Sequence, residues 1–216
     1  MEPQGRKRIS LDISEVQLKQ DLERYKNKAL DLSASRAKII RADEIPVDER
    51  VKLKCQVPRC YGYGMNTNCP PNTLKPAELR TCLEKYKWAI FFCNDIPSEN
   101  IVRNMETTKE LIAAYVKVTK IVAAIESMAF YDGYYLAVGF GAGTCRHSFC
   151  LQEEDCQTLK GNICRFAEKT RPSMEAVGID VFKMVASAGW DIYPIGSDTR
   201  ACDVQKGVLA GIVIVQ

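Results

Sequence analysis

The cysteines are the side chains of this sequence that could carry chemistry, since the chain has 10 of them and 1 histidine among 216 residues. Four of them, Cys145, Cys150, Cys156 and Cys164, are separated by four, five and seven residues. Four thiolates complete the ligand set of a [4Fe-4S] cluster, and equally that of a structural zinc ion. The residues between them are too polar for core cysteines, so the series predicts a metal-binding loop.

The spacing of these cysteines helps to decide between an iron–sulfur cluster and a zinc ion. Structural zinc sites usually pair cysteines that are about two to four residues apart, whereas this series is wider and irregular. A cubane cluster is a larger object that accommodates such a spread. We therefore predict a [4Fe-4S] cluster, with zinc as the alternative cofactor.

Basic side chains flank this loop. Arg146, Arg165 and Arg171 lie in or beside it, and a thiolate-ligated cluster carries net negative charge that cations stabilise. These arginines are the predicted cofactor-binding residues. His147 is interpreted as a neighbour of the cluster, because four cysteines already complete the ligand set.

An earlier group consists of Cys55, Cys60 and Cys69, separated by four and eight residues. Three thiolates leave one iron of a cubane open to a substrate, or they require a fourth ligand from elsewhere, for which Cys82 and Cys202 are candidates. The trio is predicted to bind metal, so that the chain holds one cluster or two. The alternative is that these cysteines are spectators in a turn-rich loop.

Hydrophobic periodicity predicts the elements that position these loops. Helices are expected over residues 16–32, 75–86, 111–128 and 173–188, and strands over residues 88–93, 134–138, 190–195 and 208–215. Shorter apolar pieces at 37–45 and 51–53 are expected to be edge strands or extended connections.

The order strand, long helix, strand between residues 88 and 138 predicts a βαβ unit with parallel strands. The expected fold class is α/β, or α+β, with a mixed or mainly parallel sheet, flanking helices and two cysteine-rich metal-binding loops. Residues 1–34 are expected to form a tail and a helix. Residues 35–216 are expected to form a single metal-binding domain with cysteine loops at 55–76 and 139–170.

Composition narrows the class of protein. Hydrophobic residues make up 46% of the chain and the formal net charge is +3, which excludes wholesale disorder and argues against nucleic acid as the main partner. No apolar run approaches the ~20 residues that span a bilayer. The first residues are charged and lack the apolar core of an export signal, so we expect a cytoplasmic protein with reduced thiols and no disulfide scaffold.

Three motifs resemble a known family. They are KCQVPRCYGYGMNTNCPP, GAGTCRHSFC with the following Cys156 and Cys164, and RPSMEAVGIDVFKMVASAGW. In this order they resemble the predicted metal-binding proteins of domain of unknown function 2284, over residues 35–195. The resemblance implies a cytoplasmic metal-binding protein, of iron–sulfur type and typical of anaerobes. The resemblance implies that the cysteines in the family motifs bind metal, namely Cys55, Cys60 and Cys69 in the first motif and Cys145, Cys150, Cys156 and Cys164 in the second. Cys82, Cys93 and Cys202 lie outside the motifs.

Three functions remain open at this point. The first is an iron–sulfur carrier that passes electrons to a partner enzyme or complex. The second is an enzyme in which the open iron of a three-cysteine cluster acts as a Lewis acid on a small substrate. The third is a zinc-stabilised interaction module.

Overall fold

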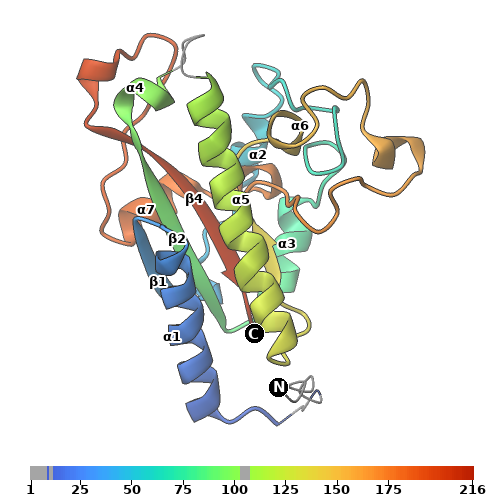
Figure 1. Cartoon of the computed structure of the whole chain (residues 1–216), viewed down its shortest axis with the longest axis vertical. Helices are drawn as coiled ribbons and strands as arrows, with labels where there is room; N and C mark the ends of the chain where they lie inside the picture. The colour runs from blue at the N-terminus through green and yellow to red at the C-terminus, as the bar shows by residue number, and fades with distance from the viewer. Residues whose placement is uncertain (1–8, 10–11, 103–107) are drawn as a thin grey trace, which may run out of the picture.

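One antiparallel sheet organises the fold (Figure 1). The structure is a computed structural model that describes residues 9, 12–102 and 108–216. Its strands, in spatial order, are β1 (Arg36–Arg41), β2 (Trp88–Pro97), β4 (Lys206–Ile214) and β3 (Val138–Phe140). All three pairings in this sheet are antiparallel. The expectation of a mixed or mainly parallel sheet is therefore wrong, and the fold is α+β.

The C-terminal strand explains this difference. A long helix does join β2 to β3, as the strand–helix–strand order predicts, and the two strands run in the same direction. However, β4 lies between them and pairs with both, for example at Phe92↔Gly211 and Gly139↔Val213. A local βαβ pattern carries no information about a strand that enters the sheet about 65 residues later. The strand expected over residues 134–138 corresponds to β3, which starts later than expected, at Val138.

One face of the sheet is covered by two long helices, α1 (Glu15–Asp31) and α5 (Thr108–Tyr131), which cross in front of it in Figure 1. Side chains alternate between the faces of a strand, and Ile90 and Phe92 of β2 point toward these helices, where both are fully buried. Both helices confirm the helical periodicity of the sequence. Their apolar faces build one half of the core.

The other face carries shorter elements. Phe91 and Cys93 of β2 are fully buried there against α3 (Pro76–Leu83) and α7 (Val181–Ser187). The single helix expected over residues 173–188 is instead two pieces, η3 (Glu175–Val177) and α7. Gly178 interrupts it with a φ of 92°, a left-handed conformation that ends the first piece.

Two further expectations about local structure are wrong. Residues 51–53 belong to a short helix, because Asp48 accepts a hydrogen bond from Arg50 N at 2.8 Å and caps it. Residues 190–195 have no regular structure, although Trp190 stacks on Phe91 with 5.3 Å between the ring centroids. The remaining elements are η1 (Ala42–Glu44), α2 (Glu49–Leu53), α4 (Ser98–Ile101), α6 (Cys145–Ser148), η2 (Gln157–Lys160) and η4 (Ala201–Asp203).

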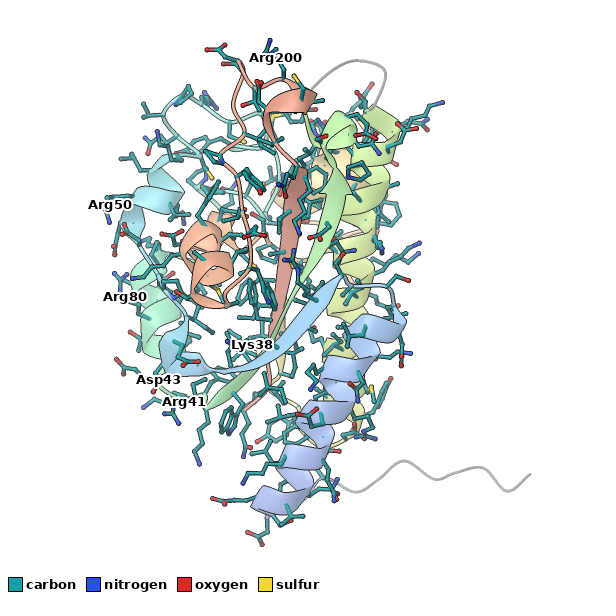
Figure 2. The ribbon with its side chains drawn as sticks, turned by 90° about the vertical axis from the view of Figure 1, so that its left-hand side faces the viewer. Lys38, Arg41, Asp43, Arg50, Arg80 and Arg200 are labelled. Carbon is teal, nitrogen blue, oxygen red and sulfur yellow. The ribbon has the colours of Figure 1, made fainter. Side chains whose placement is uncertain are left out.

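Charged side chains mark the free edge of β1. Figure 2 shows Lys38 and Arg41 along this edge strand and Asp43 in the turn that follows it. Charge on an edge strand opposes pairing with another chain. Arg50 and Arg80 project from the neighbouring α2 and α3, and Arg200 lies at the far end of the molecule in this view.

Of the tail and helix expected over residues 1–34, residues 1–8, 10 and 11 lie outside the described residues. In the part of the chain that the structure describes, no helix has the length and apolar character needed to cross a bilayer.

Candidate metal centre

The first cysteine loop is closed by hydrogen bonds of its own backbone. Cys60 N donates to Cys55 O at 2.9 Å, and Gly64 N donates to Pro70 O at 2.7 Å. Gly64 has a φ of 76°, which glycine adopts without the clash that a side chain would cause. Cys55 and Cys60 therefore belong to one tight turn that continues from α2.

The two cysteine loops meet at Thr144, the N-cap residue of α6. Its hydroxyl oxygen accepts from Asn66 Nδ2 at 3.1 Å, from Cys69 Sγ at 3.3 Å and from Arg146 N at 3.3 Å. Asn66 and Cys69 are both buried. Figure 1 shows the two loops side by side at the upper right, beyond α5. Segments about 80 residues apart in the sequence thus form one surface region.

A cavity of about 20 Å³ lies at this junction. Side chains from both loops line it: Asn66, Thr67, Asn68, Cys145, Arg146, Cys150, Asp155, Cys156, Gln157, Thr158, Cys164, Arg165 and Thr170. All four cysteines of the second series are among them. The structure therefore brings together the four thiols that the sequence singles out.

The thiols of this cavity interact electrostatically. Burial raises the pKa of Cys145 to about 12; a hydrogen bond involving Asn68 opposes the rise, and the neighbouring thiols of Cys69, Cys150 and Cys156 add to it. Cys145 therefore lies close to the first loop as well as to its own series. It is protonated near neutral pH in the metal-free protein.

Cys150 and Cys164 lie close enough to interact electrostatically. Burial raises the pKa of Cys150, and the neighbouring Cys164 and Cys156 add to this, while the positive charge of Arg146 opposes it. Cys164 Sγ accepts a hydrogen bond from Phe166 N at 3.4 Å. Backbone donors of this kind stabilise a thiolate ligand.

Cys156 has the opposite character. Burial would raise its pKa, but hydrogen bonds from the Thr158 hydroxyl and from the backbone N–H groups of Leu159, Thr67 and Thr158 lower it below the usual value. Thr158 Oγ1 lies 3.4 Å from the sulfur atom. One of these donors, Thr67, comes from the first loop, so the environment of Cys156 depends on both loops.

The three predicted arginines have different surroundings. Arg146 is buried and lines the cavity, with Nη2 donating to Glu154 O at 2.9 Å. Arg165 also lines the cavity, but it is exposed and pairs with Glu153 at 2.7 Å. Arg171 is not among the lining residues. It pairs through two nitrogens with Glu126 of α5, at 2.7–3.1 Å.

The trio of the first loop is a separate group beside the cavity. Burial raises the pKa of Cys55 to about 11, with contributions from Cys60, Cys69 and Glu175, while Lys52 opposes the rise. Cys60 is exposed and Cys69 is buried. The three thiols are thus close enough to influence one another, with Cys60 open to solvent.

All ten cysteines are free thiols. The two proposed as fourth ligands of the trio are both exposed, Cys82 on α3 and Cys202 on η4, and Cys93 is buried within the sheet. His147 stacks on Tyr61 of the first loop, with 4.4 Å between the rings. Among the described residues, no group of three or more His, Cys, Asp or Glu side chains is arranged to hold a metal ion.

Comparison with protein families identifies the family of this chain. The family model described as predicted metal-binding protein, domain of unknown function 2284, matches residues 38–214. The chain belongs to this family. The match confirms the resemblance seen in the three motifs. No curated protein and no solved structure matches the chain.

The third motif of this family member connects the two loops. At one end, Gly141 N donates to Pro172 O and Met174 N donates to Gly141 O, both at 2.9 Å, where the second loop leaves the sheet. At the other end, Asp48 N donates to Gly178 O at 2.8 Å, next to the helix that leads into the first loop. Residues 172–178 therefore set the positions of both loops relative to the sheet.

Sequence reasoning missed three residues of the centre. Asn66 and Thr144 form the junction between the loops, and Glu175 lies near Cys55. Thr144 could have been found as a helix-capping residue directly before a cysteine. Asn66 and Glu175 carried no such signal, because their importance arises from contacts with segments far away in the sequence.

Proposed function

We propose that this protein binds an iron–sulfur cluster through Cys145, Cys150, Cys156 and Cys164 and transfers electrons to a partner protein. The main observation in support of this proposal is that these four thiols line one cavity. A bound cluster would supply one-electron redox chemistry. The protein supplies the thiols, the donors that stabilise them and the surface that a partner meets.

The residues around the cavity fit a thiolate-ligated cluster. Cys156 and Cys164 receive backbone N–H donors, which stabilise sulfur atoms that carry negative charge. Arg146 adds a buried positive charge. These donors and this charge favour an anionic group in the cavity.

The spacing of the four cysteines in the sequence favours a cluster over zinc. Structural zinc sites usually pair cysteines about two to four residues apart, whereas this series is separated by four, five and seven residues. A cubane carries its thiolates on separate iron atoms, so it suits ligands spread along a loop.

Exposed apolar side chains support a protein partner. In and beside the first cysteine loop the exposed apolar residues are Leu53, Val57, Tyr61 and Met65. In the second loop they are Leu151, Leu159 and Ile163. Each of these residues is at least 41% exposed. Large apolar groups gathered at one surface region mark interaction sites. Residues 50–77 also contain five basic residues and no acidic one, which favours a partner with an acidic surface.

A second candidate is an enzyme that uses Cys55, Cys60 and Cys69 to hold a cluster with one open iron. The observation in its favour is the exposure of Cys60, which would let a small molecule reach this group. In that case the cavity cluster would feed electrons to the trio, which lies beside it through Cys69 and Cys145.

The test is metal analysis of protein purified without oxygen. We expect iron and acid-labile sulfide in the wild type, and loss of this cluster when Cys156 or Cys164 is replaced by Ser. Cys82→Ser, which changes an exposed thiol outside the cavity, is the matched control and should keep full iron content. Stoichiometric zinc without sulfide would contradict the proposal, and a second, Cys60-dependent cluster would favour the enzyme.

A further inference from the structure

Among the described residues that line the cavity, Arg146 is the arginine with buried donors that lack partners. It is the second residue of α6 and is 8% exposed, deeper than any other charged residue of the cavity wall. Its Nη2 atom donates to Glu154 O at 2.9 Å. Its Nε and Nη1 atoms are buried and have no hydrogen-bond partner.

Unmet donors on a buried cation are unfavourable. Guanidinium groups make up to five hydrogen bonds, and a buried charge is normally paired. The nearby carboxylates do not meet this need: Glu153 is paired with Arg165 at 2.7 Å, and Asp155 with Lys160 at 2.6 Å. The protein therefore holds a positive charge and free N–H groups in a cavity whose other prominent groups are thiols.

We propose that the Nε and Nη1 donors of Arg146 bind the sulfur atoms of the anionic cluster and stabilise its reduced form. This inference rests on the proposed function. Reduction of the cluster adds one electron from a low-potential donor and makes or breaks no bond, so it increases the negative charge beside Arg146. A fixed cation stabilises the more negative state more strongly, and this raises the reduction potential.

The same residue has opposite effects with and without the cluster. In the loaded protein the two donors are satisfied, and Arg146 strengthens cluster retention. In the metal-free protein they stay unmet, and the side chain is a source of instability. A residue with a purely structural role would stabilise both forms.

The experiment compares Arg146→Met and Arg146→Lys with the wild type, using the full chain prepared without oxygen. Redox titration followed by electron paramagnetic resonance measures the potential, iron release to a chelator measures retention, and thermal unfolding of the metal-free protein measures stability. Arg146→Met should lower the potential and release iron about 10- to 100-fold faster. It should leave the metal-free protein as stable as the wild type or more so. Arg146→Lys, which keeps the charge but loses the planar donor set, should fall between the two.

Arg165→Met is the matched control, because Arg165 lines the same cavity but is exposed and already paired. It should change the potential and the release rate much less. Equal potentials and release rates in the wild type and both Arg146 variants would overturn the inference while leaving the cluster proposal intact. A wild-type protein without iron and sulfide would overturn the cluster proposal, and the inference with it. If Arg146→Met fails to fold, Arg146→Lys decides by the same two measurements.

Discussion

The four thiols of the cavity differ in their readiness to act as thiolates. Cys156 receives hydrogen bonds from both loops that lower its pKa, whereas burial holds Cys145 protonated with a pKa of about 12. A metal must displace the proton of a thiol before it can bind it. Cys156 should therefore bind a metal ion more readily than Cys145 during loading.

This difference predicts the order of chemical modification in the metal-free protein. Near neutral pH, Cys156 should be alkylated faster than Cys145, because only the thiolate is nucleophilic. Labelling of Cys145 should rise only as the pH approaches its raised pKa. Mass spectrometry after pulsed alkylation at several pH values measures both rates, with the buried Cys93 as the unreactive control. Equal rates for Cys145 and Cys156 would show that the hydrogen bonds to Cys156 do not form.

At the scale of elements, a close approach between α5 and the centre of the sheet depends on Gly211. A Cβ atom at this position would lie 2.6 Å from Phe92 Cζ and 2.9 Å from Val122 Cγ2. Gly211→Ala should therefore lower the free energy of unfolding by about 1–3 kcal/mol. Gly196→Ala, where a Cβ meets no atom within 4 Å, is the control for urea denaturation. Equal stabilities of the two variants would mean that α5 can shift away from β4 at little cost.

The pair Glu126–Arg171 attaches the end of the second cysteine loop to α5. Both side chains are largely buried, at 18% and 20% exposed. Glu126→Gln leaves the guanidinium without its charged partner and should lower the free energy of unfolding by about 1.5–3 kcal/mol. Asp43→Asn breaks the exposed pair with Arg41 and should change the free energy of unfolding much less, because solvent screens this pair. Chemical denaturation of both variants would measure these changes in the free energy of unfolding. A small effect for Glu126→Gln would show that other contacts hold the loop.

The elements also show which parts of the structure the sequence could predict. The helices α1 and α5 follow from local periodicity, and the cysteine series follow from spacing alone. The position of β4 between β2 and β3 does not, because strand order depends on contacts between distant residues. The cap at Thr144 and the break at Gly178 have local causes, but their contacts with Asn66 and Asp48 could not be predicted, because these partners come from distant parts of the chain.

At the scale of the whole molecule, a sheet with two long helices supports two loops of very different character. The second loop has exposed Leu151, Leu159 and Ile163 and few buried apolar side chains, so little apolar burial holds it without a ligand. Among the described residues, we expect trypsin to cleave the metal-free protein first within residues 160–169, at Lys160, Arg165 or Lys169. Loading with iron and sulfide should slow these cuts, as mass spectrometry of the fragments would show. The Cys156→Ser variant, treated in the same way, should stay sensitive, and protection of the variant would contradict a cluster-dependent order.

The central place of β4 has a consequence for synthesis. The ribosome releases the chain from its N-terminus, so both cysteine series emerge before residues 206–214, the strand that joins β2 to β3. Until that strand arrives, the two halves of the sheet that carry the loops have no common neighbour. The sheet that supports both loops is therefore incomplete until residues 206–214 have been translated, and a cofactor delivered earlier would meet the second cysteine series without that support.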